Sequence, residues 1–87
     1  MKLKWADEAW EDYLWWRKHN QRLYERVNNL IEEIKKAPFR GIGKPEPLRH
    51  EWSGYWSRRI NEEHRLIYKV SGGVLFVAAC RYHYSEK

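Results

Sequence analysis

The feature that most constrains the fold is an apolar stripe along residues 21–36. Its members recur at helical spacing and cover roughly 100° of a helical wheel, the width that a helix needs to lie against a core. They are Leu23, Val27, Leu30, Ile31 and Ile34. Pro38 stops this helix because a proline disfavours the α region at the residue before it. The sequence therefore predicts a core-facing helix over about Gln21–Lys36.

A second helix is predicted before it, beginning at Asp7 and Glu8, whose negative charge suits a helix N-terminus. We expect its core side to be formed by the residues that share one side at helical spacing. These are Ala6, Trp10, Tyr13 and Leu14. Trp15 points the opposite way and Trp16 lies on the flank. We expect Trp15 to be partly exposed, either as a contact surface for another protein or as an isolated surface aromatic.

The rest of the chain is strand-like, apart from Phe39–Leu48, where two glycines and two prolines predict a loop. Asn61–His64 and Ser71-Gly72-Gly73 are turn signals. The strands that they separate are Lys2–Trp5, Tyr55–Ile60, Arg65–Val70 and Val74–His83. The predicted fold is α+β, with a short N-terminal strand and two helices on one face of a mainly antiparallel sheet. Residues 1–87 are expected to form one domain, because a second core would leave neither half enough apolar surface.

The last hairpin indicates which residues share a face of the sheet. If Val70 pairs with Val74, residues of equal parity lie together, and the even face is apolar from Leu66 to Cys80. We therefore expect the helices to cover Leu66, Tyr68 and Phe76. The basic residues at the ends of the odd face would then cluster on the open side, where a phosphate could dock. They are Arg65, Arg81 and His83.

Composition narrows the class of protein. The net charge of +5 favours polyanions as partners. Cys80 is the only cysteine, which excludes an internal disulfide and fits a reducing compartment. The longest apolar run, Val74–Cys80, is too short to cross a bilayer, and residues 1–10 lack the apolar region of an export signal. A cytoplasmic protein that binds no membrane is expected.

A metal centre is not expected, because Cys80 and His83 would lie on opposite faces of a strand and no other metal motif is present. The remaining polar residues suit RNA cleavage by the neighbouring 2′-hydroxyl, which needs a base, an acid and a cation. Glu46, His83 and Arg65 could supply these roles, since histidine changes its protonation near neutral pH. Each could instead be a surface residue with no part in catalysis.

Three segments carry a resemblance to a known family. They are GIGKPEPLRH, SGYWSRRINEEHRLIYKV and AACRYHY. In this order and spacing they resemble the YoeB group of RelE/ParE-superfamily toxins, and the opening WADEAWEDYLWW and the APF after the helix are also similar. The resemblance runs from Met1 to Tyr84. It implies a microbial-ribonuclease-like fold and a ribosome-dependent mRNA interferase that needs no cofactor.

By position, the resemblance implies that Glu46 is the general base, His83 the general acid and Arg65 the cation that stabilises the transition state. Tyr84 matches an aromatic that places substrate and leaving group. Arg49, Arg59 and Arg81 are expected to bind RNA phosphates. Arg49 stands where the family usually has lysine, which keeps the charge but changes its shape. The tail 85–87 extends past the family's usual end and moves the terminal carboxylate away from the site.

The resemblance also implies partners: mRNA, the ribosomal A site, a cognate antitoxin and a second copy of the chain. Two other functions stay open, a non-catalytic inhibitor like the gyrase-directed ParE toxins and a plain RNA-binding module. The pairing of Glu46 with His83 favours the enzyme, because an inhibitor has no use for a base and an acid.

Overall fold

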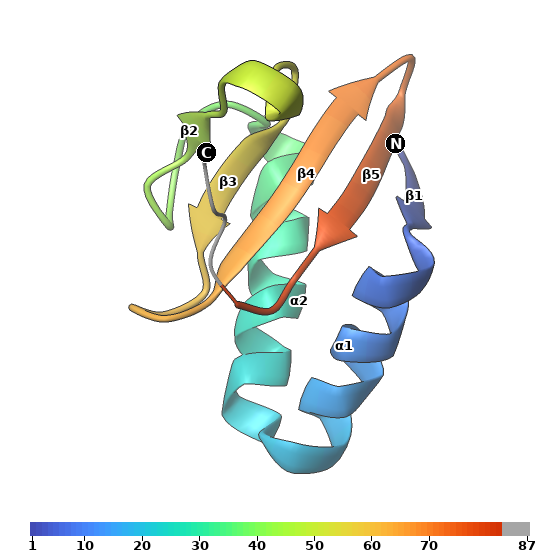
Figure 1. Ribbon diagram of the computed structural model, residues 1–87, viewed down its shortest axis with the longest axis vertical. Coiled ribbons are helices and arrows are strands. Elements are labelled where there is room, and N and C mark those ends of the chain that lie inside the picture. The colour runs from blue at the N-terminus through green and yellow to red at the C-terminus, as the bar shows by residue number, and fades with distance from the viewer. Residues whose placement is uncertain (83–87) are drawn as a thin grey trace.

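The computed structural model describes residues 1–82, and its strands form one sheet in the order β1-β5-β4-β3-β2 (Figure 1). Along the chain the elements are β1 (Lys2–Trp5), α1 (Asp7–His19), α2 (Gln21–Lys36), β2 (Glu46–Pro47), the 3₁₀ helix η1 (His50–Trp52), β3 (Trp56–Arg59), β4 (Arg65–Ser71) and β5 (Val74–Ala79). Only β1 runs parallel to its neighbour, and the other pairs are antiparallel. The predicted α+β fold is confirmed.

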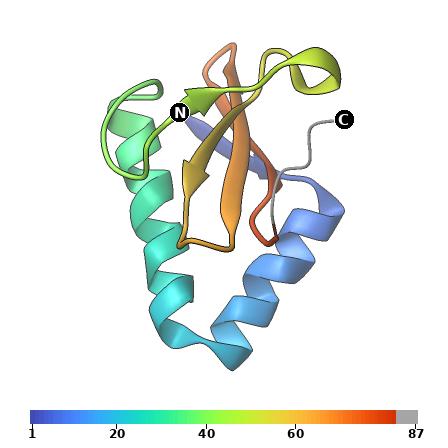
Figure 2. The same cartoon turned by 60° about the vertical axis from the view of Figure 1, so that its left-hand side comes forward.

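The helix α2 has the predicted bounds and packs its apolar stripe on the sheet. The Asn20 side chain caps it by accepting a hydrogen bond from the Leu23 N–H at 3.1 Å. Val27, Leu30 and Ile34 are fully buried, whereas Leu23, one turn from the start, is only partly so. Figure 2 shows α1 and α2 meeting at their short connection, at the end of the molecule opposite β2 and η1.

The prediction for the core side of α1 is confirmed for Ala6 and Tyr13, which pack against the core. It is wrong for Trp10 and Leu14, which are exposed, and the buried residues of α1 are Ala9 and Trp16. Trp16 donates from Nε1 to the Cys80 carbonyl at 2.8 Å, so its indole is buried with its polar atom satisfied. Small Ala9 lets the helix approach β5 closely, which the hydrophobic spacing does not reveal. Trp10 instead packs edge-on against Trp5, with ring centroids 5.5 Å apart.

The predicted register of the last hairpin is also wrong. Ser71, not Val70, pairs with Val74, so Val70 faces Leu75 and Tyr68 faces Val77. A bulge between Ile67 and Tyr68 shifts the pairing again. The face of β5 that meets the helices is therefore the odd one, with Leu75 and Val77 fully buried. Phe76 lies on the other face and is only half-buried, because the turn takes two residues instead of three.

One segment predicted as loop contains an edge strand. Glu46 pairs with Ser57 and Pro47 with Trp56, and the Leu48 N–H donates to the Tyr55 carbonyl at 2.9 Å. Proline tolerates this position because an edge strand needs no donor on its outer side. The pairing ties Glu46 to the sheet, which matters for the site.

Candidate active site

The face of the sheet that α1 and α2 leave uncovered, called the open face here, collects the polar residues of interest. Leu66 and Tyr68 of β4 are buried in the core, so their neighbours Arg65 and Ile67 point the other way. Cross-strand partners share a face, and Arg65 pairs with Arg59 while Ile67 pairs with Ser57, itself the partner of Glu46. The expectation that Arg65 lies on the open side is confirmed.

These residues form rows across the open face. Glu46, Ser57, Ile67 and Ala79 make one row, in that order from β2 to β5. Arg59 and Arg65 make the next row, two residues along β3 and β4, or about 6.7 Å. Glu46 and the two arginines thus occupy neighbouring rows on one surface, as a base and charge-stabilising cations would need to do.

The loop that delivers Glu46 is held by a buried arginine, Arg58. Its Nη2 donates to the carbonyls of Ala37 at 2.6 Å and Arg40 at 2.8 Å, and its Nη1 donates to that of Ile42 at 3.1 Å. Its Nε donates to the Tyr68 hydroxyl at 3.1 Å. Arg58 is fully buried, and such a charge is tolerated because each of these bonds replaces water.

Two further contacts fix the same loop. The Tyr68 hydroxyl donates to the Pro38 carbonyl at 2.6 Å, and burial raises the pKa of Tyr68, so the phenol remains a donor at neutral pH. Gly43 has a φ of 82°, and a Cβ there would lie 3.0 Å from Leu30 and 3.2 Å from the Arg59 carbonyl. Glycine is required at this approach. The sequence predicts only a loop at this glycine and assigns no role to Arg58.

Arg65 is oriented by the turn that precedes it. Its Nη1 donates to the carbonyls of Asn61 at 2.8 Å, Glu62 at 3.1 Å and His64 at 3.1 Å. Asn61 in turn stabilises the turn, because its Oδ1 accepts from the backbone N–H of Glu63 and of His64. Within residues 1–82, Nη2 and Nε of Arg65 make no hydrogen bond and can meet a phosphate.

The same turn holds the chain just before His83. The Tyr82 N–H donates to Nδ1 of His64 at 2.7 Å, and the Arg65 N–H donates to the Tyr82 carbonyl at 3.1 Å. His64 is buried, with its ring edge-on to Trp16 at 4.8 Å. In the sequence nothing distinguishes this histidine from the other polar residues of the turn. His83 and Tyr84 themselves, with the tail 85–87, lie outside the described residues.

The other predicted phosphate ligands divide into two groups. Arg59 is exposed on the open face beside Arg65, and Arg49 is exposed at the start of η1, two residues after β2. The guanidinium of Arg81 lies against α1 instead: its Nη1 is 3.5 Å from the Asp12 carboxylate, and its carbon is 3.7 Å from the Trp15 ring centroid. The expected clustering of Arg81 with Arg65 is therefore wrong, because the side chain of Arg81 lies against α1.

The thiol of Cys80 is not placed for nucleophilic chemistry. Burial, with a smaller effect of Asp12, raises the pKa of Cys80 to about 12, so the thiol is neutral and unreactive. Its Sγ lies 3.3 Å from the Ala9 carbonyl.

Among residues 1–82, no three His, Cys, Asp or Glu side chains are grouped so as to hold a metal ion. In the same range no helix is long and apolar enough to cross a membrane.

The fold, with two helices on one face of a five-stranded sheet, is shared with solved structures of bacterial toxins. A YoeB/ParE toxin from Agrobacterium tumefaciens superposes with a TM-score of 0.94 at 50% identity, over 97% of this chain and 100% of that chain. A YoeB dimer and a YoeB–YefM complex from Staphylococcus aureus give TM-scores of 0.91 and 0.90 at 38% and 39% identity, each over 97% of this chain and 98% of theirs.

The sequence comparisons agree and are more specific. Residues 5–84 match the model of the YoeB-like toxins of bacterial type II toxin–antitoxin systems. Toxin YoeB of Escherichia coli (strain K12) is 55% identical over 84 residues, which cover 97% of this chain and 100% of that protein. The chain belongs to the YoeB-like toxin family, and the resemblance seen in its motifs is confirmed.

Proposed function

We propose that this chain is a ribosome-dependent, metal-independent endoribonuclease that cuts mRNA and acts as the toxin of a type II toxin–antitoxin pair. The observation that carries the proposal is the placement of Glu46 one row from Arg59 and Arg65 on the open face, in a member of the YoeB-like family. A carboxylate beside two arginines on an accessible surface suits a polyanion that must lose a proton during attack.

In the proposed reaction Glu46 removes the proton of the 2′-hydroxyl, whose oxygen then attacks the adjacent phosphorus. The bond from phosphorus to the 5′-oxygen breaks, and His83 gives that oxygen a proton. The products are a 2′,3′-cyclic phosphate and a free 5′-hydroxyl. Arg65 stabilises the charge on the phosphorane through the nitrogens that its turn leaves available, and Tyr84 places the leaving group.

The remaining arginines would bind the RNA backbone. Arg59 lies in the row of Arg65, and Arg49 follows β2 closely, so both can meet phosphates that flank the cut. The guanidinium of Arg81 contacts Trp15 and Asp12 of α1. It would have to leave both before it could bind a phosphate. We rank it third among the three.

The proposal includes partners and a location. A YoeB dimer and a YoeB–YefM complex from Staphylococcus aureus have been solved at 38–39% identity to this chain. We infer that this chain likewise forms a homodimer and binds a cognate antitoxin that disables the open face. mRNA and the ribosomal A site are then its targets, which places it in the cytoplasm.

The test is to incubate the purified protein with programmed ribosomes and, separately, with the same mRNA free in solution, and to map new 5′ ends. We expect discrete cuts on the ribosome and far fewer on free mRNA. Binding to the ribosome without any new 5′ end would favour a non-catalytic inhibitor. Equal cutting of both substrates would remove the ribosome from the proposal.

A further inference from the structure

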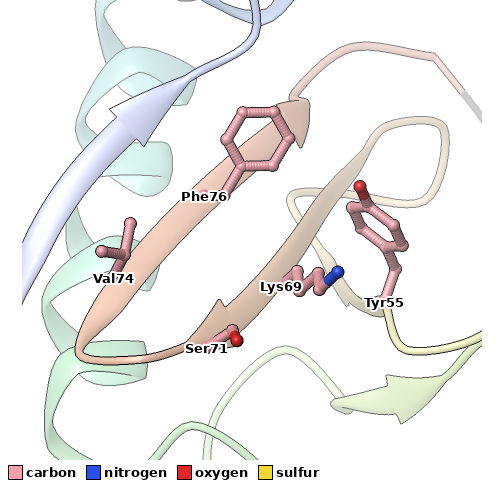
Figure 3. Close-up of a pocket in the computed structure, with 5 residues that line it drawn as sticks. All are labelled: Tyr55, Lys69, Ser71, Val74 and Phe76. Carbon is pink, nitrogen blue, oxygen red and sulfur yellow. The ribbon is translucent and has the colours of Figure 1, made fainter.

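A second feature of the open face lies beside the rows described above. It is a hollow of about 210 Å³ toward the β4–β5 turn (Figure 3). Its lining residues are Tyr55, Lys69, Ser71, Val74 and Phe76. The proposed reaction assigns no role to any of them.

The lining combines aromatic rings with a cation. Tyr55 comes from the segment before β3 and Phe76 from β5, and both are half-buried, so each ring keeps part of its surface accessible. The Lys69 ammonium lies 5.4 Å from the Tyr55 ring centroid and points toward that ring in Figure 3. Trp52 packs edge-on against Tyr55, with centroids 5.2 Å apart, and so limits the positions that the ring can take. Stacking surfaces with an adjacent cation are what single-stranded nucleic acids bind.

The position of the hollow relative to Glu46 is set by the register. Lys69 pairs with Phe76 and lies two residues along β4 from Ile67, which belongs to the row of Glu46. Arg65 lies two residues from Ile67 in the other direction. The open face therefore presents three successive rows about 6.7 Å apart: arginines, then Glu46, then the hollow. Such a spacing suits successive nucleotides of an extended strand.

We propose that the hollow binds one nucleobase of the RNA next to the scissile phosphate. The base stacks on the rings of Tyr55 and Phe76, and the Lys69 ammonium contacts the phosphate of the same nucleotide. The proposal rests on the function proposed above and adds to it a subsite that positions substrate. An RNA fits this surface better than a peptide, because its rows carry the cations Arg59, Arg65 and Lys69. The aromatic rings of the hollow lie beside Lys69, one of these cations.

The test combines a double variant of the protein with an altered substrate. Tyr55→Leu/Phe76→Leu keeps apolar volume but removes both rings. mRNAs with one abasic nucleotide at each position flanking the mapped cut are presented on programmed ribosomes, and single-turnover cleavage is measured. One abasic position should slow the native protein by about 5- to 150-fold, the range expected for losing one stacked base. The double variant should be slower on intact mRNA and indifferent to that abasic position.

Two controls keep the outcome interpretable. Phe39→Leu removes an exposed aromatic outside the hollow and should change nothing in this assay. Lys69→Met alters only an exposed side chain, so it tests the subsite even where the double variant folds poorly, and it should raise KM severalfold.

The results that would overturn the subsite differ from the result that would overturn the proposed function. A folded double variant that cuts like the native protein, or that remains fully sensitive to every abasic position, overturns the subsite. So does a double variant that loses only antitoxin affinity, because the hollow would then serve that partner. Failure of the native protein to cut any mRNA would instead overturn the proposed function.

Discussion

Arg58 and Arg59 are neighbours in the sequence, yet their side chains leave β3 on opposite faces of the sheet. Arg58 is fully buried on the helix side, where it binds three carbonyls of the 37–42 loop and the Tyr68 hydroxyl. Arg59 is exposed on the open face beside Arg65. The same side chain is a structural tie on one face and a candidate phosphate ligand on the other.

The difference teaches how this small protein separates stability from chemistry. The polar residues on the helix side, such as Arg58, are buried with their hydrogen bonds made. Removing one leaves its buried partners with neither a protein nor a water molecule to bond to. Glu46 and Arg59 of the open face are exposed, so they can be replaced at small cost to folding. Stability and activity should therefore respond to different substitutions.

The largest effect expected concerns the open face. Glu46→Ala, Arg65→Ala and His83→Ala should each reduce the cleavage rate by about 10²–10⁴, because each removes a base, an acid or a charge-stabilising group. Their growth-arrest activity on expression should disappear. Urea denaturation of Glu46→Ala should give a midpoint near that of the native protein, since Glu46 is exposed. Full toxicity of any variant would remove that residue from the mechanism.

Arg58→Met and Arg59→Met make a matched pair that tests the comparison itself. The first should lower the free energy of unfolding by at least about 3 kcal/mol, because several buried carbonyls lose their donor. The second should change it by less than about 0.5 kcal/mol and weaken cleavage instead. Denaturation curves give the free energy of unfolding of each variant, and a cleavage assay gives its rate. Similar stabilities for the two variants would contradict the assignment of faces.

Leu75→Ala and Phe76→Ala make the same comparison on β5. Leu75 is fully buried, and its truncation should cost about 2–5 kcal/mol of unfolding free energy. Phe76 is larger but half-buried on the open face, so its truncation should cost only about 1 kcal/mol. A larger loss at Phe76 than at Leu75, measured by chemical denaturation, would support the register that the structure rejects.

The smallest effect is expected at Trp15, which is 37% exposed and stacks on Arg81. Its predicted partial exposure is confirmed, and its role as a contact surface stays a prediction. Trp15→Glu should weaken dimerisation or antitoxin binding about tenfold, because an exposed tryptophan is a common anchor of interfaces. Lys18→Gln gives the same change in charge on the same helix and serves as control. Unchanged affinities for both partners would make Trp15 an isolated surface aromatic.

The sequence predicts the element types well because the patterns that set them are local. The stripe of α2, the stop at Pro38 and the Ser71-Gly72-Gly73 turn each act within a few residues. The register of β4 and β5 depends on how many residues the turn takes and on a bulge, and neither is visible in alternation alone. A one-residue difference moved Phe76 to the open face and Leu75 into the core.

The candidate site is predictable in part for a similar reason. Glu46, Arg59 and Arg65 were found by motif and chemistry, and the structure brings them to one face. Arg58 and His64 were missed, because what matters about them is which distant carbonyl or N–H they meet. On α1 the burial of Trp16 is not predictable, because its indole donates to the carbonyl of Cys80, far away in the sequence.

The central claim is that the open face cuts RNA through the RNA's own 2′-hydroxyl. The most direct measurement presents programmed ribosomes with an mRNA that carries one 2′-deoxy nucleotide at the scissile position, with all ions held constant. We expect this mRNA to bind but to resist cutting, while the all-ribose mRNA gives a 2′,3′-cyclic phosphate, or its 3′-phosphate product, and a 5′-hydroxyl. A nuclease that activates water with metal ions would cut both and usually leave a 3′-hydroxyl. Efficient cutting at the deoxy position would contradict the roles proposed for Glu46 and His83.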